Sequence, residues 1–407
     1  MAISVETAIE IISNLTLNLN YEIIPIENAT NRICAQEIFA TSFLPKFNNS
    51  AMDGYAIIFE NKDNALTIID TIFAGDNNDK LLENNSCIKI MTGAKIPNNT
   101  TAIIPKEDTE KLDDNKIKII KNVKEFQHIR YIGEDIKQNE LLINIGDEIN
   151  FSRITLLASQ GISHIKVYKK PKVVVFASGE ELKLHYEKIE SHQIYNSNTP
   201  TFVSRAIELG CDVTFIGQAK DTIIGIKELI TNCLDANLII TSGGVSVGDA
   251  DFTKEAFNEL NFQTIFDGIN IKPGKPTVFG KIENTYILNL PGNPLASALI
   301  FETFGKILIQ KFLGSKDIYH NYILGKLKDS FFTKKGRITI LSGFFDGEYF
   351  YISEKRSPGM VAVLNSCNAM IIIDDNLEKL EKNTLVKILP INWKFFSDIK
   401  KDFLTHE

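Results

Sequence analysis

Apolar residues recur at helical spacing near the start of the chain. Positions 5, 8, 9 and 12 are apolar and follow Ser4, a residue type that commonly caps helix N-termini, so this pattern predicts a helix. A second helical pattern starts at about Phe151 and leads into His164–Tyr168. We expect these segments to pack together, which makes residues 1–26 and 147–170 a discontinuous linking domain.

Residues 27–146 and 317–407 consist of short apolar runs separated by polar turns. The first region is rich in Asn, Gly and Thr and contains β-like runs such as Ala65–Thr71 and Lys116–Ile120. It is therefore predicted to be a β-rich domain whose loops carry motifs. The second region predicts a small β-barrel or sandwich from four runs, namely Arg337–Leu341, Tyr349–Ser353, Ala369–Ile373 and Leu385–Pro390.

Residues 171–316 alternate apolar strands with amphipathic helices. The expected strands are Lys172–Phe176, Val213–Ile216, Leu238–Thr241 and Tyr286–Leu290, and the expected helices are Thr199–Leu209, Thr222–Leu234 with Asp221 as its N-cap, Phe252–Leu260 and one from Leu295. Such alternation predicts a doubly wound parallel sheet with helices on both faces. Sheets of this kind bind ligands at the carboxyl ends of their strands. The predicted fold class is therefore α/β plus β, in several domains.

Composition narrows the possible functions. The chain has 44 basic and 51 acidic residues and no long Lys/Arg run, which argues against nucleic acid or an anionic membrane surface as a partner. No apolar run approaches the ~18 residues of a membrane span. A secretory signal would begin with basic residues, but no Lys or Arg precedes Arg32. Five cysteines without a C-x-x-C pair fit reduced thiols better than disulfides or a zinc site. We therefore expect a cytoplasmic protein.

The strongest candidate for chemistry is the segment Thr241–Asp251, which follows a predicted strand and precedes a predicted helix. Its glycines and serines expose backbone N–H and hydroxyl donors near a helix N-terminus, an arrangement that suits phosphate. Asp249 and Asp251 would lie beside the phosphate, where they could hold Mg²⁺. The alternative is a Gly-rich turn with an Asp N-cap. The segment is not a Walker loop, because no Gly-Lys-Ser/Thr follows.

Two proline-containing segments add possible anion donors. Lys-Pro-Gly-Lys-Pro at 272–276 holds two lysines in a stretch stiffened by prolines, which suits an oxyanion or a phosphate, although a solvated turn explains it equally well. Leu-Pro-Gly-Asn-Pro at 290–294 places Pro294 in the first turn of a helix, where backbone N–H groups are available to an anion. Taken alone, this second segment is a capping device.

Carboxylates occur in three further loops. Asp53 lies in Asn-Ser-Ala-Met-Asp-Gly-Tyr-Ala at 49–56, Asp135 ends Gly-Glu-Asp, and Glu180 and Glu181 directly follow the first expected strand of the parallel sheet. Thr92, in Thr-Gly-Ala, offers a hydroxyl and a backbone N–H to an anion. Each of these segments could also be a plain turn or an acidic loop. Together, the segments predict a site for a phosphorylated substrate and a metal ion.

Six of these motifs occur in the order and at the spacing of the MoeA family of molybdopterin molybdenumtransferases, which is related to the C-terminal domain of gephyrin. The chain resembles that family along nearly its whole length. The resemblance implies four domains and an elongated homodimer, with the site between the parallel-sheet domain of one subunit and the β-rich domain of the other. The implied substrates are adenylylated molybdopterin and molybdate. The implied reaction releases AMP with Mg²⁺ and places molybdenum on the dithiolene sulfurs.

The resemblance also assigns roles to residues and partners. Asp249 would bind Mg²⁺, and Lys272 and Lys275 would bind molybdate or neutralise phosphate charge. The carboxylates that would position water and move protons are Asp53, Asp135, Glu181, Asp221 and Asp251. The implied substrate-binding residues are Thr92, Ser242, Gly243, Gly244, Ser246, Gly248, Pro291, Gly292, Asn293 and Pro294. The adenylyltransferase that precedes this step and the acceptor molybdoenzymes are the implied protein partners.

This sequence departs from the family's pattern at two places. Gly268 stands where many relatives have a basic residue, and residues 357–362 differ from the family's Ser-rich loop. Two other functions share part of the pattern. A molybdopterin adenylyltransferase has the parallel-sheet domain but lacks the regions 1–170 and 322–407, and a receptor-anchoring scaffold uses the dimeric domain without catalysis.

Overall fold

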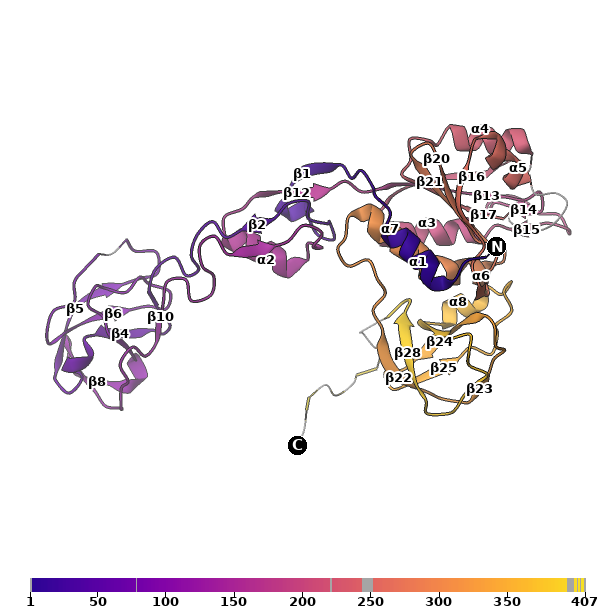
Figure 1. The fold of residues 1–407 in the computed structure, drawn as a ribbon. Helices are drawn as coiled ribbons and strands as arrows, with labels where there is room; N and C mark the ends of the chain where they lie inside the picture. The colour runs from indigo at the N-terminus through magenta and orange to yellow at the C-terminus, as the bar shows by residue number, and fades with distance from the viewer. Residues whose placement is uncertain are drawn as a thin grey trace.

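The computed structural model describes residues 2–77, 79–219, 222–243, 252–393, 399–400, 402 and 404–405. Figure 1 shows an elongated molecule with a β-rich module at one end, a linking module in the middle, and a large sheet and a barrel at the other end. This is the multidomain α/β plus β architecture that the sequence predicts. Within the described ranges, no helix has the length and apolar composition that crossing a bilayer requires.

The first helix, α1 (Val5–Ser13), begins where the sequence predicts but packs elsewhere. Ser4 is its N-cap, and Ser4 Oγ accepts a 3.0 Å hydrogen bond from the Thr7 N–H. The apolar face of the helix joins the main core and packs against α7 (Lys306–Leu313), as Figure 1 shows. The expectation that α1 packs with the segment from Phe151 is therefore wrong, because an apolar stripe fixes which face is buried and not what covers it.

In the chain, the β-rich module is inserted between the two parts of the linking module. The linking module consists of β1 (Tyr21–Pro25), β2 (Ile38–Phe39), β11 (Leu141–Ile143), α2 (Phe151–Ser159) and β12 (His164–Tyr168), and β1 pairs with β12. The β-rich module has a sheet in the order β7-β4-β6-β5-β9-β8. Its strands are β4 (Gly54–Ile57), β5 (Leu66–Ile72), β6 (Ser86–Ile90), β7 (Ala102–Pro105), β8 (Thr109–Asp113) and β9 (Lys116–Ile119), with β3 (Asn49–Ser50) paired to β10 (Ile129–Arg130) beside it.

The large sheet has six strands in the order β16-β13-β17-β21-β20-β18. They are β13 (Lys172–Ser178), β16 (Asp212–Ala219), β17 (Leu238–Ser242), β18 (Gln263–Asp267), β20 (Val278–Ile282) and β21 (Thr285–Leu290). The first four strands in this order are parallel, whereas β20 and β18 are antiparallel to their neighbours. The prediction was a parallel sheet, whereas the structure has a mixed sheet with two antiparallel strands at one edge.

Helices cover both faces of this sheet, as a doubly wound fold requires. They are α3 (Asn198–Glu208), α4 (Ile223–Thr231), α5 (Phe252–Glu259), α6 (Pro294–Ile300) and a π-helical turn (Phe301–Gly305) that leads into α7. Core residues of α3, α6 and α7 lie on one face, and those of α4 and α5 lie on the other. The N-cap of α4 is Thr222, whose side chain accepts from the Gly225 N–H, and not Asp221 as predicted.

The C-terminal module is a closed barrel of five strands, with β24 also paired to β26. The barrel strands are β22 (Ile323–Leu327), β24 (Ile338–Phe345), β25 (Tyr349–Ile352), β26 (Ala369–Ile373) and β28 (Leu385–Pro390), and the smaller elements are β23 (Phe331–Phe332), β27 (Lys379–Leu380) and α8 (Ala362–Ser366). A short strand from the preceding module, β19 (Ile271–Lys272), joins the barrel beside β24.

Candidate active site

Three loops meet at the carboxyl edge of the parallel strands. Ser178 ends β13, Ser242 ends β17 and is followed by Gly243, and Pro291-Gly292 follows β21. Gly243 has φ +100°, and a Cβ placed on it would lie 2.7 Å from the Ser178 carbonyl oxygen. Only glycine allows this close approach of the two strand ends. The sequence therefore predicted correctly that these segments come together.

One residue that joins two of these loops was not predicted. Asn198, in the first turn of α3, donates from Nδ2 to Ser242 Oγ and to the Gly292 carbonyl, both at 2.7 Å. Ser242 Oγ in turn donates to the Pro291 carbonyl at 3.1 Å. Ser242 is only 2% exposed, so its hydroxyl is engaged inside the protein. The sequence carries no signal for this bridge, because it joins residues that are far apart in the chain.

The first turn of α6 does not offer free N–H groups to an anion, contrary to the prediction. Pro294 occupies the first position as expected and has no N–H. The Leu295 and Ala296 N–H groups both donate to the carbonyl of Pro358, at 2.9 and 3.3 Å. Pro358 belongs to the C-terminal module, in the segment that departs from the family's Ser-rich loop. This module therefore caps the helix that follows the sheet.

Buried polar atoms without partners gather near the same edge of the sheet. Thr241 and Asn289 are opposite one another on β17 and β21, and neither is more than 1% exposed. Their side-chain polar atoms, like Thr199 Oγ1 and Asn196 Nδ2 at the start of α3, have no hydrogen-bond partner among the described residues. Buried polar groups are rarely left without a hydrogen bond, so these atoms indicate that further polar groups bind at this edge of the sheet.

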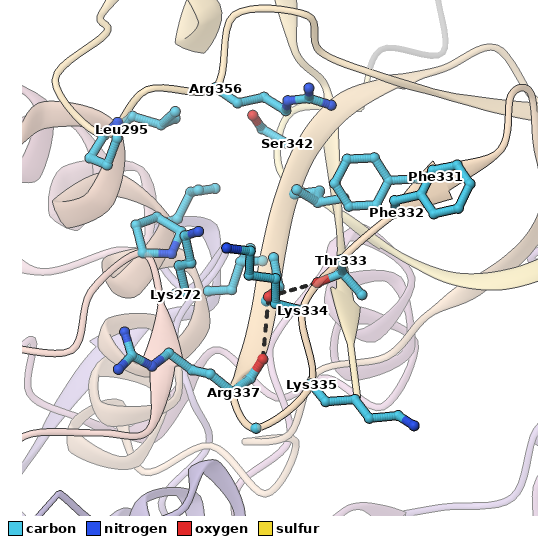
Figure 2. Close-up of a pocket in the computed structure, with 17 residues that line it drawn as sticks. Lys272, Leu295, Phe331, Phe332, Thr333, Lys334, Lys335, Arg337, Ser342 and Arg356 are labelled. Carbon is cyan, nitrogen blue, oxygen red and sulfur yellow. Dashed lines mark hydrogen bonds between the residues drawn. The ribbon is translucent and has the colours of Figure 1, made fainter. Parts of the chain in front are cut away.

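Lys272 lies in a basic cleft that is also lined by residues of α6 and of the barrel. The cleft has a volume of about 670 Å³ and is also lined by Lys334, Lys335, Arg337 and Arg356 (Figure 2). None of the described residues that line it is Asp or Glu. The short strand that carries Lys272, β19, pairs with β24 of the barrel. Its second lysine, Lys275, is exposed and outside this cleft.

The cleft combines positive charge with aromatic side chains. Of its five cations, only Lys335 has a described carboxylate within ion-pair distance, Glu378 at 3.5 Å. Figure 2 shows Phe331 and Phe332 on one wall, and the Arg356 guanidinium lies 5.1 Å from the centre of the Phe331 ring. Several unpaired cations around one cavity attract an anion, since like charges gathered without counter-ions raise the local potential.

Asp53 and Thr92 form the second part of the predicted site, in the β-rich module. Thr92 donates to Asp53 Oδ1 from its backbone N–H and from its hydroxyl, both at 2.8 Å. These bonds, the backbone one first, hold the pKa of the Asp53 carboxyl below its ordinary value, so the carboxylate is ionised at neutral pH. Gly54 follows, where a Cβ would collide with the Ile104 carbonyl oxygen of the neighbouring strand.

The other predicted carboxylates are not joined to this pair. Asp135 is exposed, and no hydrogen bond between described residues connects it to Asp53 or Thr92. Glu181 is exposed beyond the end of β13, with its carboxylate folded back over Gly179. Asn293 is the N-cap residue of α6. Six predicted site residues lie outside the described residues, namely Asp221, Gly244, Ser246, Gly248, Asp249 and Asp251. The described residues contain no group of three or more His, Cys, Asp or Glu placed to hold a metal ion.

The cysteines are poor metal ligands. All five are buried, and burial raises the pKa of each thiol, to about 12 for Cys87 and Cys211. Thiols with raised pKa values stay protonated, whereas a metal binds the thiolate.

Two family models match this chain. Residues 3–161 match the MoeA N-terminal region (domains I and II), and residues 173–311 match the probable molybdopterin binding domain. A molybdopterin molybdenumtransferase of Haemophilus influenzae is 39% identical over 298 residues, which cover 72% of this chain and 74% of that protein. One of Staphylococcus epidermidis is 30% identical over 410 residues, which cover 95% of each.

Solved structures with a similar fold are also known. Two structures of molybdopterin biosynthesis MoeA protein from Pyrococcus horikoshii have TM-scores of 0.83 and 0.84. Their identities to this chain are 27% and 23%, and they cover 97% and 96% of it and all of their own length. The similarity therefore extends over every module.

Proposed function

Because this chain belongs to the MoeA family, we propose that it is a molybdopterin molybdenumtransferase acting in molybdenum cofactor biosynthesis. In the proposed reaction, adenylylated molybdopterin and molybdate react with Mg²⁺-dependent release of AMP. Molybdenum is transferred to the dithiolene sulfurs of the pterin. A reaction of this kind needs sites for a phosphorylated substrate and for an oxyanion.

The basic cleft that contains Lys272 is the observation that carries the oxyanion part of the proposal. Molybdate is a dianion, and the cleft offers five cations of which four have no described carboxylate partner. Lysine and arginine side chains bind oxyanions through charge-assisted hydrogen bonds. The cleft lies next to the start of α6, which follows the Pro291-Gly292 loop, so the oxyanion and the substrate loops are close together.

The carboxylates have separate proposed roles. Asp53 is ionised because Thr92 stabilises its charged form, so it can accept a proton or orient water as molybdate loses oxygen. Mg²⁺ bound at Asp249 would act as a Lewis acid on the pyrophosphate. Lys275, outside the cleft, would neutralise phosphate charge. Asp135, Glu181, Asp221 and Asp251 remain proposed proton carriers.

We further propose that the complete site needs a second copy of the chain. Figure 1 shows β4 and β6 of the β-rich module far from the large sheet, with the linking module between them. A side chain such as Asp53 therefore does not share a site with Lys272 within one subunit. A homodimer with two-fold symmetry can bring the β-rich module of one subunit to the cleft of the other.

The test is AMP release from adenylylated molybdopterin, measured with and without molybdate and Mg²⁺. We expect release that requires both, with molybdenum-loaded pterin as the product. Consumption of ATP with free molybdopterin, and no AMP release from the adenylylated form, would assign the chain to the adenylyltransferase step. Absence of turnover in both assays would favour a binding protein without catalysis.

A further inference from the structure

Building on the proposed function, we infer that Asn198 is the positioning residue that holds the two substrate loops at a fixed separation. The two loops are the Ser242-Gly243 turn and the Pro291-Gly292 turn, which follow neighbouring parallel strands. Nothing else in the described hydrogen-bond pattern joins them through a side chain from a third element. Asn198 therefore belongs to the binding of the phosphorylated pterin and not to that of the oxyanion.

The orientation of the Asn198 amide follows from its partners. A backbone carbonyl can only accept, so the 2.7 Å contact with the Gly292 carbonyl identifies the nearby amide atom as the NH₂ group. Its second N–H donates to Ser242 Oγ, and this leaves the Ser242 hydroxyl proton free to donate to Pro291. The three bonds form one chain of donors and acceptors, in which each group is used once.

The remaining amide atom, Oδ1, is not bonded to any residue that the structure describes. Asn198 itself is half-buried. Since both N–H groups point into the protein, Oδ1 is directed away from the two turns. It can accept a hydrogen bond from a hydroxyl or amino group of a nucleotide or pterin. The residue thus orients both loops and presents one acceptor to the substrate.

The helix that carries Asn198 is held firmly. The N–H of Thr199 donates to Asn196 Oδ1 at 3.2 Å, and α3 packs on β13, β17 and α6. Phe202 and Ala206 of the same helix are fully buried in the main core. A rigid helix fixes the position of the amide, so loss of its donors changes the loops and not the helix.

The most informative variant is Asn198→Asp, which keeps the shape of the side chain and removes both donors. Its carboxylate would face the Gly292 carbonyl, so the bridge between the loops cannot form. Loss of both donors releases the two loops from each other, and we expect this to weaken substrate binding roughly tenfold. We expect the KM for adenylylated molybdopterin to rise about tenfold, with the KM for molybdate unchanged. Asn232→Asp, at an exposed amide after α4, is the matched control and should behave like wild type.

A double-mutant cycle separates positioning from general destabilisation. Asn198→Ala and Ser242→Ala interrupt the same chain of bonds, so their combined effect on the pterin KM should be smaller than the sum of the single effects. Equal increases in both KM values, or a lowered unfolding midpoint with an unchanged pterin KM, would overturn the positioning role. Additive effects would also overturn it.

The same variants distinguish failure of this inference from failure of the proposed function. If the wild-type protein releases no AMP, the proposed function fails, and the bridge is then tested by calorimetric binding of AMP alone. About tenfold weaker AMP binding by Asn198→Asp, with Asn232→Asp unchanged, supports the bridge without turnover. Equal AMP affinities, or no AMP binding by any of the proteins, refute it.

Discussion

If each site combines residues from the β-rich module of one subunit and the basic cleft of the other, two inactive variants should recover activity when mixed. One variant changes a residue of the β-rich module, and the other changes a residue of the cleft. Asp53→Asn changes the β-rich module, and Lys272→Gln changes the basic cleft beside the barrel. These modules lie at opposite ends of the subunit (Figure 1). Asp53 and Lys272 of the same chain therefore cannot contribute to the same site. In a mixed dimer, however, one of the two sites contains both intact residues.

The size of the recovery follows from counting sites. Random exchange of equal amounts of the two variants gives about one half mixed dimers, and each of these has one intact site of two, so about 25% of the wild-type rate should return. Each variant alone should retain far less. Removal of a hydrogen bond to a charged group costs about 1.5–3 kcal/mol, which corresponds to roughly 10–150-fold in rate at limiting molybdate.

The assay is AMP release at molybdate concentrations below KM, after the subunits have exchanged. A mixture of Asp53→Asn with the double variant Asp53→Asn/Lys272→Gln is the matched control, because no combination of these chains restores an intact site. If mixed dimers form but the activity equals the average of the two single variants, the site does not combine residues from two subunits and the reasoning is refuted.

Three further outcomes follow from single residues. Lys272→Gln should raise the KM for molybdate roughly tenfold or more and weaken its dependence on salt, since a cation is lost from an anion site. Thr92→Val should raise the pKa of Asp53 towards its ordinary value and move the acid limb of the pH–rate profile to higher pH, whereas Thr92→Ser should not. His320 has a pKa lowered chiefly by burial, and its Nε2 lies 2.7 Å from the Thr303 carbonyl, so the unfolded chain takes up a proton first as the pH falls below about 6.5. Wild-type unfolding midpoints in urea should therefore fall between pH 8 and pH 5.5, and His320→Gln should reduce this fall; an unchanged pH dependence would contradict the assignment.

Much of the fold follows from local patterns, and the failures concern pairing over long distances. The run Lys172–Phe176 predicts a buried strand because β-branched residues are continuous in it, and the structure extends that strand to Ser178. The antiparallel edge of the sheet was not predicted, because β18 and β20 look like any other short apolar runs. Strand direction is set by the connections and partners of a strand, which its own residues do not specify.

The same distinction holds for the candidate site. Ser242 and Gly243 were found from sequence because a Gly-rich turn after a strand is a local feature. Asn198 and Pro358 were missed because their roles depend on contacts with loops that are distant in sequence. Lys272 was recognised as a possible anion ligand, but the barrel residues that line its cleft were not predicted, since only the pairing of β19 with β24 brings them together.

A site shared between subunits requires a defined arrangement of modules within each subunit, and contacts between the linking module and the segment that follows α7 supply part of that constraint. The Lys316 N–H donates to the Gly146 carbonyl at 3.0 Å, and Lys316 Nζ and Arg153 Nη2 lie 2.5 and 3.1 Å from Asp147 Oδ1. Burial alone would raise the pKa of Asp147, but the bond from Lys316 and the charge of Arg153 help to keep it below its ordinary value. The carboxylate is thus ionised at neutral pH, and this ion pair ties the linking module to the segment that follows α7. If the site is shared between subunits as proposed, a fixed junction of this kind narrows the positions that the linking module can take relative to the large sheet, which a flexible tether would not do.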